Sequence, residues 1–286
     1  VGLTKTTTGT VTLSGANTYT GATTVSAGVL NIQNSSALGT GTVNVTVSSG
    51  AALQLQGDIT ISNKTLSLTG TGVSTTGALR NISGNNTWTG AITLAGTTRI
   101  NSDSGLLTLS AISGTNRSLT IGGAGNTTII GVIATGTGTL TKDGAGTLTL
   151  SGANTYTGAT TISAGTLQLG AEGVIADTSA VTVTGTLDLN GKNETIGSLA
   201  GAGTVTSTTA VSIILTAGGN NTSTTFSGII NDGSGTVAFT KTGTGTLTLS
   251  GANTFTGGLT IKAGTVKGTT SANAFGAGTV TLGDSD

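Results

Sequence analysis

The sequence contains no cysteine, no histidine and no proline, and it has only one tryptophan, two tyrosines and four phenylalanines. The absence of cysteine excludes disulfides and thiol chemistry, and it is common in surface proteins that cross a bacterial envelope unfolded. The absence of histidine excludes Ser-His-Asp triads, His-ligated zinc and imidazole acid–base catalysis. The chain is therefore neither a disulfide scaffold nor a histidine-dependent enzyme.

Charged residues make up only 7% of the chain, with ten basic residues balancing ten acidic ones. They are scattered singly, so the sequence offers no electrostatic surface for nucleic acid or an anionic membrane. The longest apolar runs, such as residues 129–133, are far below the roughly 18 residues that span a bilayer. We expect no nucleic-acid partner and no membrane-spanning segment in this stretch.

Hydrophobic residues make up 35% of the sequence and alternate with polar ones, among fifty glycines. In residues 147–150 and 166–169 the period is two, which is typical of strands with one buried face. Threonine, serine and valine predominate, which favours strands over helices, and no segment predicts a helix. We expect these side chains to point into the core: Leu148, Leu150, Ile162, Leu167 and Leu169.

A stretch of about 30 residues, 140–169, recurs almost unchanged from Leu3 and from Phe239, and in eroded form at Ile82–Gly96. Repetition of this kind is the signature of a stacked architecture. The aligned aromatic residues lie 69, 68 and 99 residues apart, and the first two intervals divide into three turns of about 23 residues each. The sequence predicts roughly 12 coils, which at about 4.8 Å per coil would form a rod of about 55–60 Å.

A second module, Ala37–Val43, recurs at Ala274–Val280 and follows the aromatic by about 20 residues. Together with the segment LTKxGxGTLTLSGANTYTGATTISAGTLQLG, it resembles the autotransporter-associated β-strand repeat, or passenger-associated transport repeat, of bacterial secreted and surface proteins. The resemblance covers essentially the whole chain. It implies an all-β, right-handed parallel β-helix at or released from the cell surface, with a repeat associated with passenger secretion and folding and with no catalytic residue carried over. We expect residues 1–286 to form a single elongated array that is part of a longer chain.

Three motif positions have a physical interpretation. The asparagines are expected at a corner, in the left-handed conformation, pairing their amides with neighbouring coils. The aromatics are expected to pack in the core or at a corner, with a carbohydrate-stacking stripe as the alternative. Lys5, Lys142 and Lys241 are expected to bury their stems and hold their ammonium groups in solvent. The structural motif residues are Asn17, Tyr19, Asn86, Trp88, Asn154, Tyr156, Asn253 and Phe255.

Catalytic chemistry has only a weak basis in the sequence. A glycosidase needs two carboxylates about 5 to 9.5 Å apart. Asp177, Asp188 and Glu194 are the residues to consider, but their spacing places them on no common face, and we interpret them as isolated surface acids. We predict no catalytic residue, metal site or cofactor.

The sequence therefore predicts a non-enzymatic extracellular structural or adhesive protein: a β-solenoid stalk, surface layer or fibre component of an autotransporter-like passenger. One alternative is an ice-binding solenoid that uses outward Thr-x-Thr arrays, and another is a carbohydrate-active β-helix enzyme. Expected partners are a host or matrix glycan or protein receptor, and further solenoid turns. Because neither end resembles a cap, those turns would belong to a longer chain or to molecules stacked end to end.

Overall fold

A computed structural model describes residues 1–283, and its regular elements there are β-strands apart from one short 3₁₀ turn, η1 (Val73–Thr75). The strands are mostly two to six residues long and pair in parallel with strands one turn away. Over the described residues this makes a β-solenoid of about 13 turns. No helix in this part of the chain has the length and apolar character needed to cross a membrane.

The alternation of apolar and polar residues sets the direction of the side chains, as the sequence predicted. Leu148, Leu150, Ile162, Leu167 and Leu169 are all fully buried. The threonines between them are partly exposed. Since side chains on a strand alternate between its two faces, the inward set is apolar and buried and the outward set forms a hydroxyl-rich surface.

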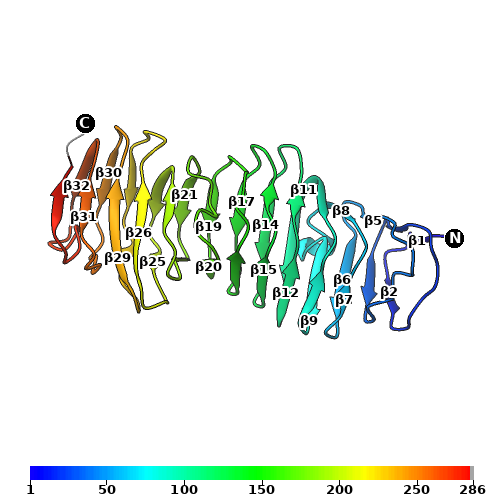
Figure 1. The fold of residues 1–286 in the computed structure, drawn as a ribbon. Helices are drawn as coiled ribbons and strands as arrows, with labels where there is room; N and C mark the ends of the chain where they lie inside the picture. Colours follow the sequence, from blue (N-terminus) through cyan, green and yellow to red (C-terminus); the bar gives the residue numbers. More distant parts are fainter. Residues whose placement is uncertain (284–286) are drawn as a thin grey trace. The chain divides into compact units, whose positions relative to one another are not determined.

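The structure divides into two compact units, Val1–Gly152 and the remainder from Ala153, and each is built from stacked turns. The expectation of one single array stays a prediction. In the first unit the strands line three faces, and Figure 1 shows β14 beside β17 and β12 beside β15.

Face 1 of the first unit pairs successive strands from turn to turn. It consists of β1 (Leu3–Lys5), β3 (Thr23–Val25), β5 (Val45–Val47), β8 (Leu66–Gly70), the start of β11 (Ile92–Ser102), β13 (Ile112–Ser113) and β16 (Ile133–Ala134). Face 2 consists of β2 (Thr10–Leu13), β4 (Val29–Ile32), β6 (Ala52–Gln56), β9 (Leu79–Ser83), the end of β11, β14 (Leu119–Gly122) and β17 (Leu140–Lys142). Face 3 consists of β7 (Thr60–Ile61), β10 (Asn86–Trp88), β12 (Leu106–Leu109), β15 (Asn126–Ile129) and β18 (Thr147–Leu150).

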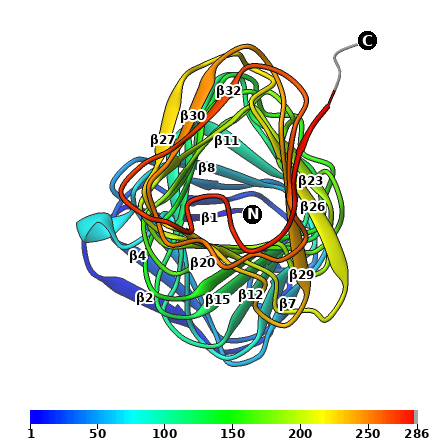
Figure 2. The same ribbon diagram turned by 90° about the vertical axis from the view of Figure 1, so that its left-hand side faces the viewer.

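The second unit has three faces of its own, and Figure 2 shows β27 and β30 on one side of the turns and β26 and β29 on another. Face 4 consists of β19 (Thr160–Ile162), β21 (Ala180–Val183), β24 (Ser198–Gly201), β27 (Thr224–Phe226), β30 (Thr246–Leu249) and β32 (Thr265–Gly268). Face 5 consists of β20 (Thr166–Leu169), β22 (Thr186–Asp188), β25 (Thr204–Thr206) and β28 (Ile229–Ile230). Face 6 consists of β23 (Glu194–Ile196), β26 (Ser212–Ala217), β29 (Thr236–Lys241), β31 (Leu259–Ile261) and β33 (Val280–Leu282).

Turn length varies along the chain, around the value of about 23 residues that the aromatic spacing predicted for its first interval. The turn that leads from Val181 to its partner Leu199 is short. The turn that leads from Leu66 to its partner Ile92 is considerably longer. Because the corners rather than the strands absorb these differences, the core continues through turns of unequal length.

The intact repeats do not begin on the same face, which corrects the expected alignment of the aromatics. The Leu-Thr-Lys strand of the first copy is β1, on face 1, whereas the same strand of the second copy is β17, on face 2. From Trp88 onward, successive pairing leads through Leu109 and Ile129 to Leu150. Three whole turns after Trp88 therefore end before Tyr156 is reached, and the second copy starts one face later.

Candidate functional site

The motif asparagines bind the backbone of the neighbouring turn. In each intact repeat, the side-chain amide nitrogen donates to a carbonyl oxygen 20 or 21 residues further along. That carbonyl belongs to the loop that follows the repeat, which explains why the module around Ala37 recurs at Ala274. The pairs are Asn17 with Ala37 (2.9 Å), Asn154 with Val174 (2.6 Å) and Asn253 with Ala274 (2.5 Å).

One of these asparagines, and the motif asparagine of the eroded copy, also bind the preceding turn through their side-chain oxygen atoms. Asn253 Oδ1 accepts from the Ile230 N–H at 2.7 Å, and Asn86 Oδ1 accepts from the Ile59 N–H at 2.8 Å. The left-handed conformation expected at these positions was wrong, because none of the four motif asparagines has a positive φ. The left-handed asparagines are others, at Asn63, Asn116, Asn190 and Asn221.

The motif aromatics pack inward. Trp88, Tyr156 and Phe255 are fully buried, and Tyr19 is half-buried. Gly39 and Gly276, with φ of 72° and 76°, lie in the next turn where a Cβ would collide with the carbonyl oxygen of Tyr19 or Phe255. The glycine is therefore needed for this close approach as well as for its backbone conformation. A carbohydrate-stacking stripe is not available from three buried rings.

The residue four positions after each aromatic matches the chemistry of the ring, a signal that our sequence interpretation missed. Both tyrosine hydroxyls bond a threonine at that position, Tyr19 to Thr23 and Tyr156 to Thr160, each at 2.7 Å. After Trp88 and Phe255, the same position holds isoleucine and leucine. A buried phenol needs a polar partner and a phenyl ring does not, so the two residues vary together.

The motif lysines are buried, so the expectation of solvated ammonium groups was wrong. Lys5, Lys142 and Lys241 are 5%, 2% and 1% exposed. Lys142 Nζ donates to the carbonyl oxygens of Asp143 and Gly144 at 2.7 and 2.8 Å. The corner after each lysine turns its carbonyls inward, where the ammonium group satisfies several at once. Burial lowers the pKa of Lys142 to about 8, with Asp143 opposing that shift and Arg99 adding to it.

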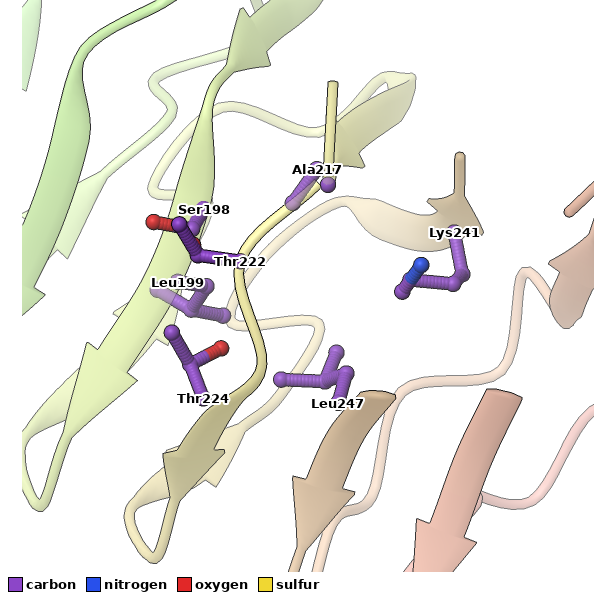
Figure 3. A pocket seen from close by; sticks show the side chains of 8 residues that line it. Ser198, Leu199, Ala217, Thr222, Thr224, Lys241 and Leu247 are labelled. Carbon is purple, nitrogen blue, oxygen red and sulfur yellow. The ribbon is translucent and has the colours of Figure 1, made fainter. Parts of the chain in front are cut away.

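The lysine also joins the start of a repeat to its end. Lys5 Nζ donates to the Ala27 carbonyl at 3.1 Å, and Lys241 Nζ donates to the Ala263 carbonyl at 3.4 Å, each 22 residues further along. Figure 3 shows the Lys241 side chain extending toward a space bordered by Leu199 and Leu247, and that space is only about 10 Å³. Burial lowers the pKa of Lys241 as well.

Two of the three acids considered for catalysis are buried, which corrects our interpretation of them as isolated surface groups. Asp188 is 2% exposed, and its carboxylate accepts from Gln168 Nε2, the Thr208 hydroxyl and the N–H groups of Asn190 and Thr208, at 2.7–3.0 Å. A carboxylate with four donors is a structural anchor for its corner. It does not line a hollow with the other two acids.

Glu194 and Asp177 line one open hollow of about 250 Å³, although the sequence placed them on no common face. Glu194 is 3% exposed, and its carboxylate accepts from the N–H groups of Val174 (3.0 Å), Ile175 (3.4 Å) and Thr195 (3.2 Å). Burial raises the pKa of Glu194 to about 7, the three N–H donors oppose the shift, and Asp177 adds to it. A carboxyl that titrates near neutral pH could transfer a proton, but these donors hold it as part of the wall.

The outward threonines form single columns rather than a flat array. One column on face 3 and another on face 6 each contain five threonines in register. The neighbouring column on face 3 includes Leu106 paired with Asn126, and the neighbouring column on face 6 includes Ile214 paired with Ala238. The columns are Thr60–Thr87–Thr108–Thr128–Thr149 and Thr195–Thr216–Thr240–Thr260–Thr281.

Comparisons with known proteins find a repeat family and a curated relative. The passenger-associated-transport-repeat family matches the chain at residues 3–32, 140–169 and 239–267. Among curated proteins, the chain is similar to the adhesin BmaC autotransporter of Brucella suis biovar 1 (strain 1330), with 35% identity over 138 residues. That match covers 46% of this chain and 4% of the relative's length. No solved structure matches the chain.

The fold and the motif geometry define the class of protein: a parallel β-solenoid whose repeated side chains bind one turn to the next. The three intact copies that carry these side chains are passenger-associated transport repeats.

Proposed function

We propose that this chain is a non-enzymatic, extracellular segment of a bacterial autotransporter passenger, where it forms part of an adhesive stalk. One observation carries the proposal. The polar side chains that recur with the repeat, the lysine and the asparagine, bond to backbone carbonyls of the solenoid and present no reactive group to solvent. A repeat that uses its distinctive residues for cohesion suits a structural role.

The similarity to an adhesin autotransporter supports the adhesive part of the proposal and a secreted or cell-surface location. A hydroxyl-rich surface can hydrogen-bond to a host or matrix glycan or protein receptor. In this proposal further solenoid turns continue in a longer chain or stack end to end.

The two alternatives fit the geometry less well. Ice binding needs a two-dimensional array of hydroxyls, and the threonine columns are flanked by Leu106, Ile214 and Ala238. A glycosidase needs two carboxyls free to face the substrate, and Glu194 holds three backbone N–H groups instead.

Beads coated with the folded segment test the proposal. We expect them to adhere to epithelial cells and extracellular matrix above beads coated with the heat-denatured segment. We expect no turnover of a polysaccharide panel at any pH from mildly acidic to mildly basic. Folded beads that adhere to nothing would refute the adhesive role, and turnover that is lost in an Asp177→Asn variant would refute the non-enzymatic one.

A further inference from the structure

An open hollow lies on the first unit, at the carboxyl ends of the face 1 strands β13 and β16. Its volume is about 430 Å³, which is within the range of ligand sites. It is lined by the hydroxyl-bearing residues Thr93, Ser113 and Thr115 and by Arg117. Ala134 adds a small apolar surface. All four polar residues are exposed, so their groups are accessible to a ligand.

The backbone explains why a hollow forms here. Strand β11 passes from face 1 to face 2 with an irregularity between Leu94 and Thr98. The next turn makes the same passage through residues 114–118, a loop between β13 and β14. Gly114 also lines the hollow, and an added Cβ there would lie 3.1 Å from Leu94 Cβ and 3.4 Å from Arg117 Cβ.

Hydrogen bonds to the following turn hold this loop in place. The Gly114 N–H donates to the Ala134 carbonyl at 3.0 Å. Asn116 Oδ1 accepts from the Thr137 N–H at 3.0 Å, and the Ser118 hydroxyl oxygen accepts from the Thr139 N–H at 3.3 Å. Since both neighbours of Arg117 in the sequence are fixed, its Cα is positioned before any ligand arrives, which reduces the entropy cost of binding.

Arg117 also stands apart electrostatically. The other two arginines form ion pairs, Arg80 with Asp103 at 2.5 Å and Arg99 with Asp143 at 2.6 Å. The lysines of residues 1–152 are all buried. Arg117 forms no ion pair within the described residues, and it is the one exposed cationic side chain of the first unit.

We propose that this hollow binds the carboxylate of an acidic sugar residue. A guanidinium matches a carboxylate with two parallel hydrogen bonds, and the three hydroxyls can pair with the ring hydroxyls of the same sugar. The inference deepens the proposed adhesive function and rests on it, because it names acidic glycans as the receptor class. A neutral glycan would lose the charge-assisted pair.

Titration with defined sugars tests the site. The probes are a sialylated trisaccharide, a glucuronate-containing tetrasaccharide, and the matched neutral oligosaccharides, with binding followed by NMR or calorimetry. We expect the parent to bind an acidic probe with a Kd below about 1 mM, the neutral probes to bind at least about tenfold more weakly, and affinity to fall as salt is raised. Arg117→Gln should weaken acidic binding at least about tenfold, and Arg117→Lys should restore only part of it.

The matched control is Lys262→Gln, which removes an exposed cation from the second unit and should leave binding unchanged. Both variants should keep the parental circular dichroism and unfolding midpoint, because neither side chain is buried. Failure of the parent to bind any acidic probe, or equal binding by parent and Arg117→Gln, would overturn the inference. Beads carrying Arg117→Gln that still adhere fully would overturn it while leaving the adhesive function intact. Acidic-sugar binding by a segment whose beads adhere to nothing would refute the adhesive function and leave the site standing.

Discussion

The pairing of Tyr156 with Thr160 gives a quantitative test of how the repeat is held together. The Tyr156 ring is fully buried, and its hydroxyl lies 2.7 Å from the Thr160 hydroxyl oxygen. Thr160 in turn lies 3.1 Å from the Ser179 hydroxyl oxygen, and Ser179 donates to the Gly158 carbonyl at 2.9 Å. The three hydroxyls therefore form a buried chain that links two turns.

The expected loss in the free energy of unfolding depends on which buried groups lose their hydrogen-bond partners. Thr160→Val keeps the shape of the side chain but leaves the buried phenol without this partner, which should cost about 1–3 kcal/mol. Tyr156→Phe should cost less, about 0.5–1.5 kcal/mol, because Thr160 keeps its bond to Ser179. The double variant removes both ends of the bond, as Phe255 and Leu259 do in the third copy, so its cost should fall below the sum by about 1–2 kcal/mol.

Urea unfolding followed by circular dichroism measures these free energies, and hydrogen exchange localises them to residues 156–179. The matched control is Thr23→Val in the first copy. The Tyr19 hydroxyl makes the same 2.7 Å bond, but Tyr19 is only half-buried although Thr23 is buried, so the cost should be smaller than that of Thr160→Val. Additive costs for the two second-copy substitutions would refute the idea that the ring and the residue four positions later vary as a pair.

Three further perturbations test other parts of the structure. Burial raises the pKa of Glu194 from 4.5 to about 7, so the folded protein binds the proton more tightly and loses stability as pH rises through that window. Glu194→Gln should flatten this part of the unfolding profile. Lys142→Met should lower the free energy of unfolding by about 1–3 kcal/mol for each carbonyl left without a donor. The exposed-site control Lys262→Met should change the free energy of unfolding by less than about 0.5 kcal/mol. Equal midpoints in urea for the two variants would show that the buried ammonium group is dispensable. Leu150→Asp should lower the free energy of unfolding by several kcal/mol, because it buries an unpaired charge. Unchanged amide exchange in β18 would contradict the inward orientation assigned to Leu150.

Which side chains of a strand point inward could be predicted from the sequence, because a pattern with a period of two has only two possible phases. Once Leu148 and Leu150 are assigned inward, Thr147 and Thr149 must face out, and the structure confirms this assignment. Parallel stacking followed from the repetition itself. These properties depend on the local pattern, which is present in each strand.

The faces of the solenoid and the destinations of the long polar side chains could not be predicted in the same way. The face on which the second copy begins depends on the accumulated length of every corner between Trp88 and Tyr156, and the local pattern does not fix the length of a corner. The fate of Lys142 depends on carbonyls that turn inward at the following corner, a backbone feature with no signature in the side-chain pattern. Glu194 and Asp177, 17 positions apart in the sequence, line one hollow because two successive turns bring them together.

The asparagine and the aromatic of each intact copy share a placement within the turn. In each intact copy the segment with the asparagine and the aromatic contains no strand: residues 14–22, 151–159 and 250–258. On that side of the turn no strand forms, and the amide of Asn154 and the ring of Tyr156 supply inward contacts in its place. The eroded copy shows the converse, because Asn86–Trp88 forms strand β10 and pairs on both sides, and no lysine stands at the equivalent position before it. In the intact copies the asparagine and the aromatic therefore lie where a strand is missing, and the asparagine binds that strandless segment to the next turn.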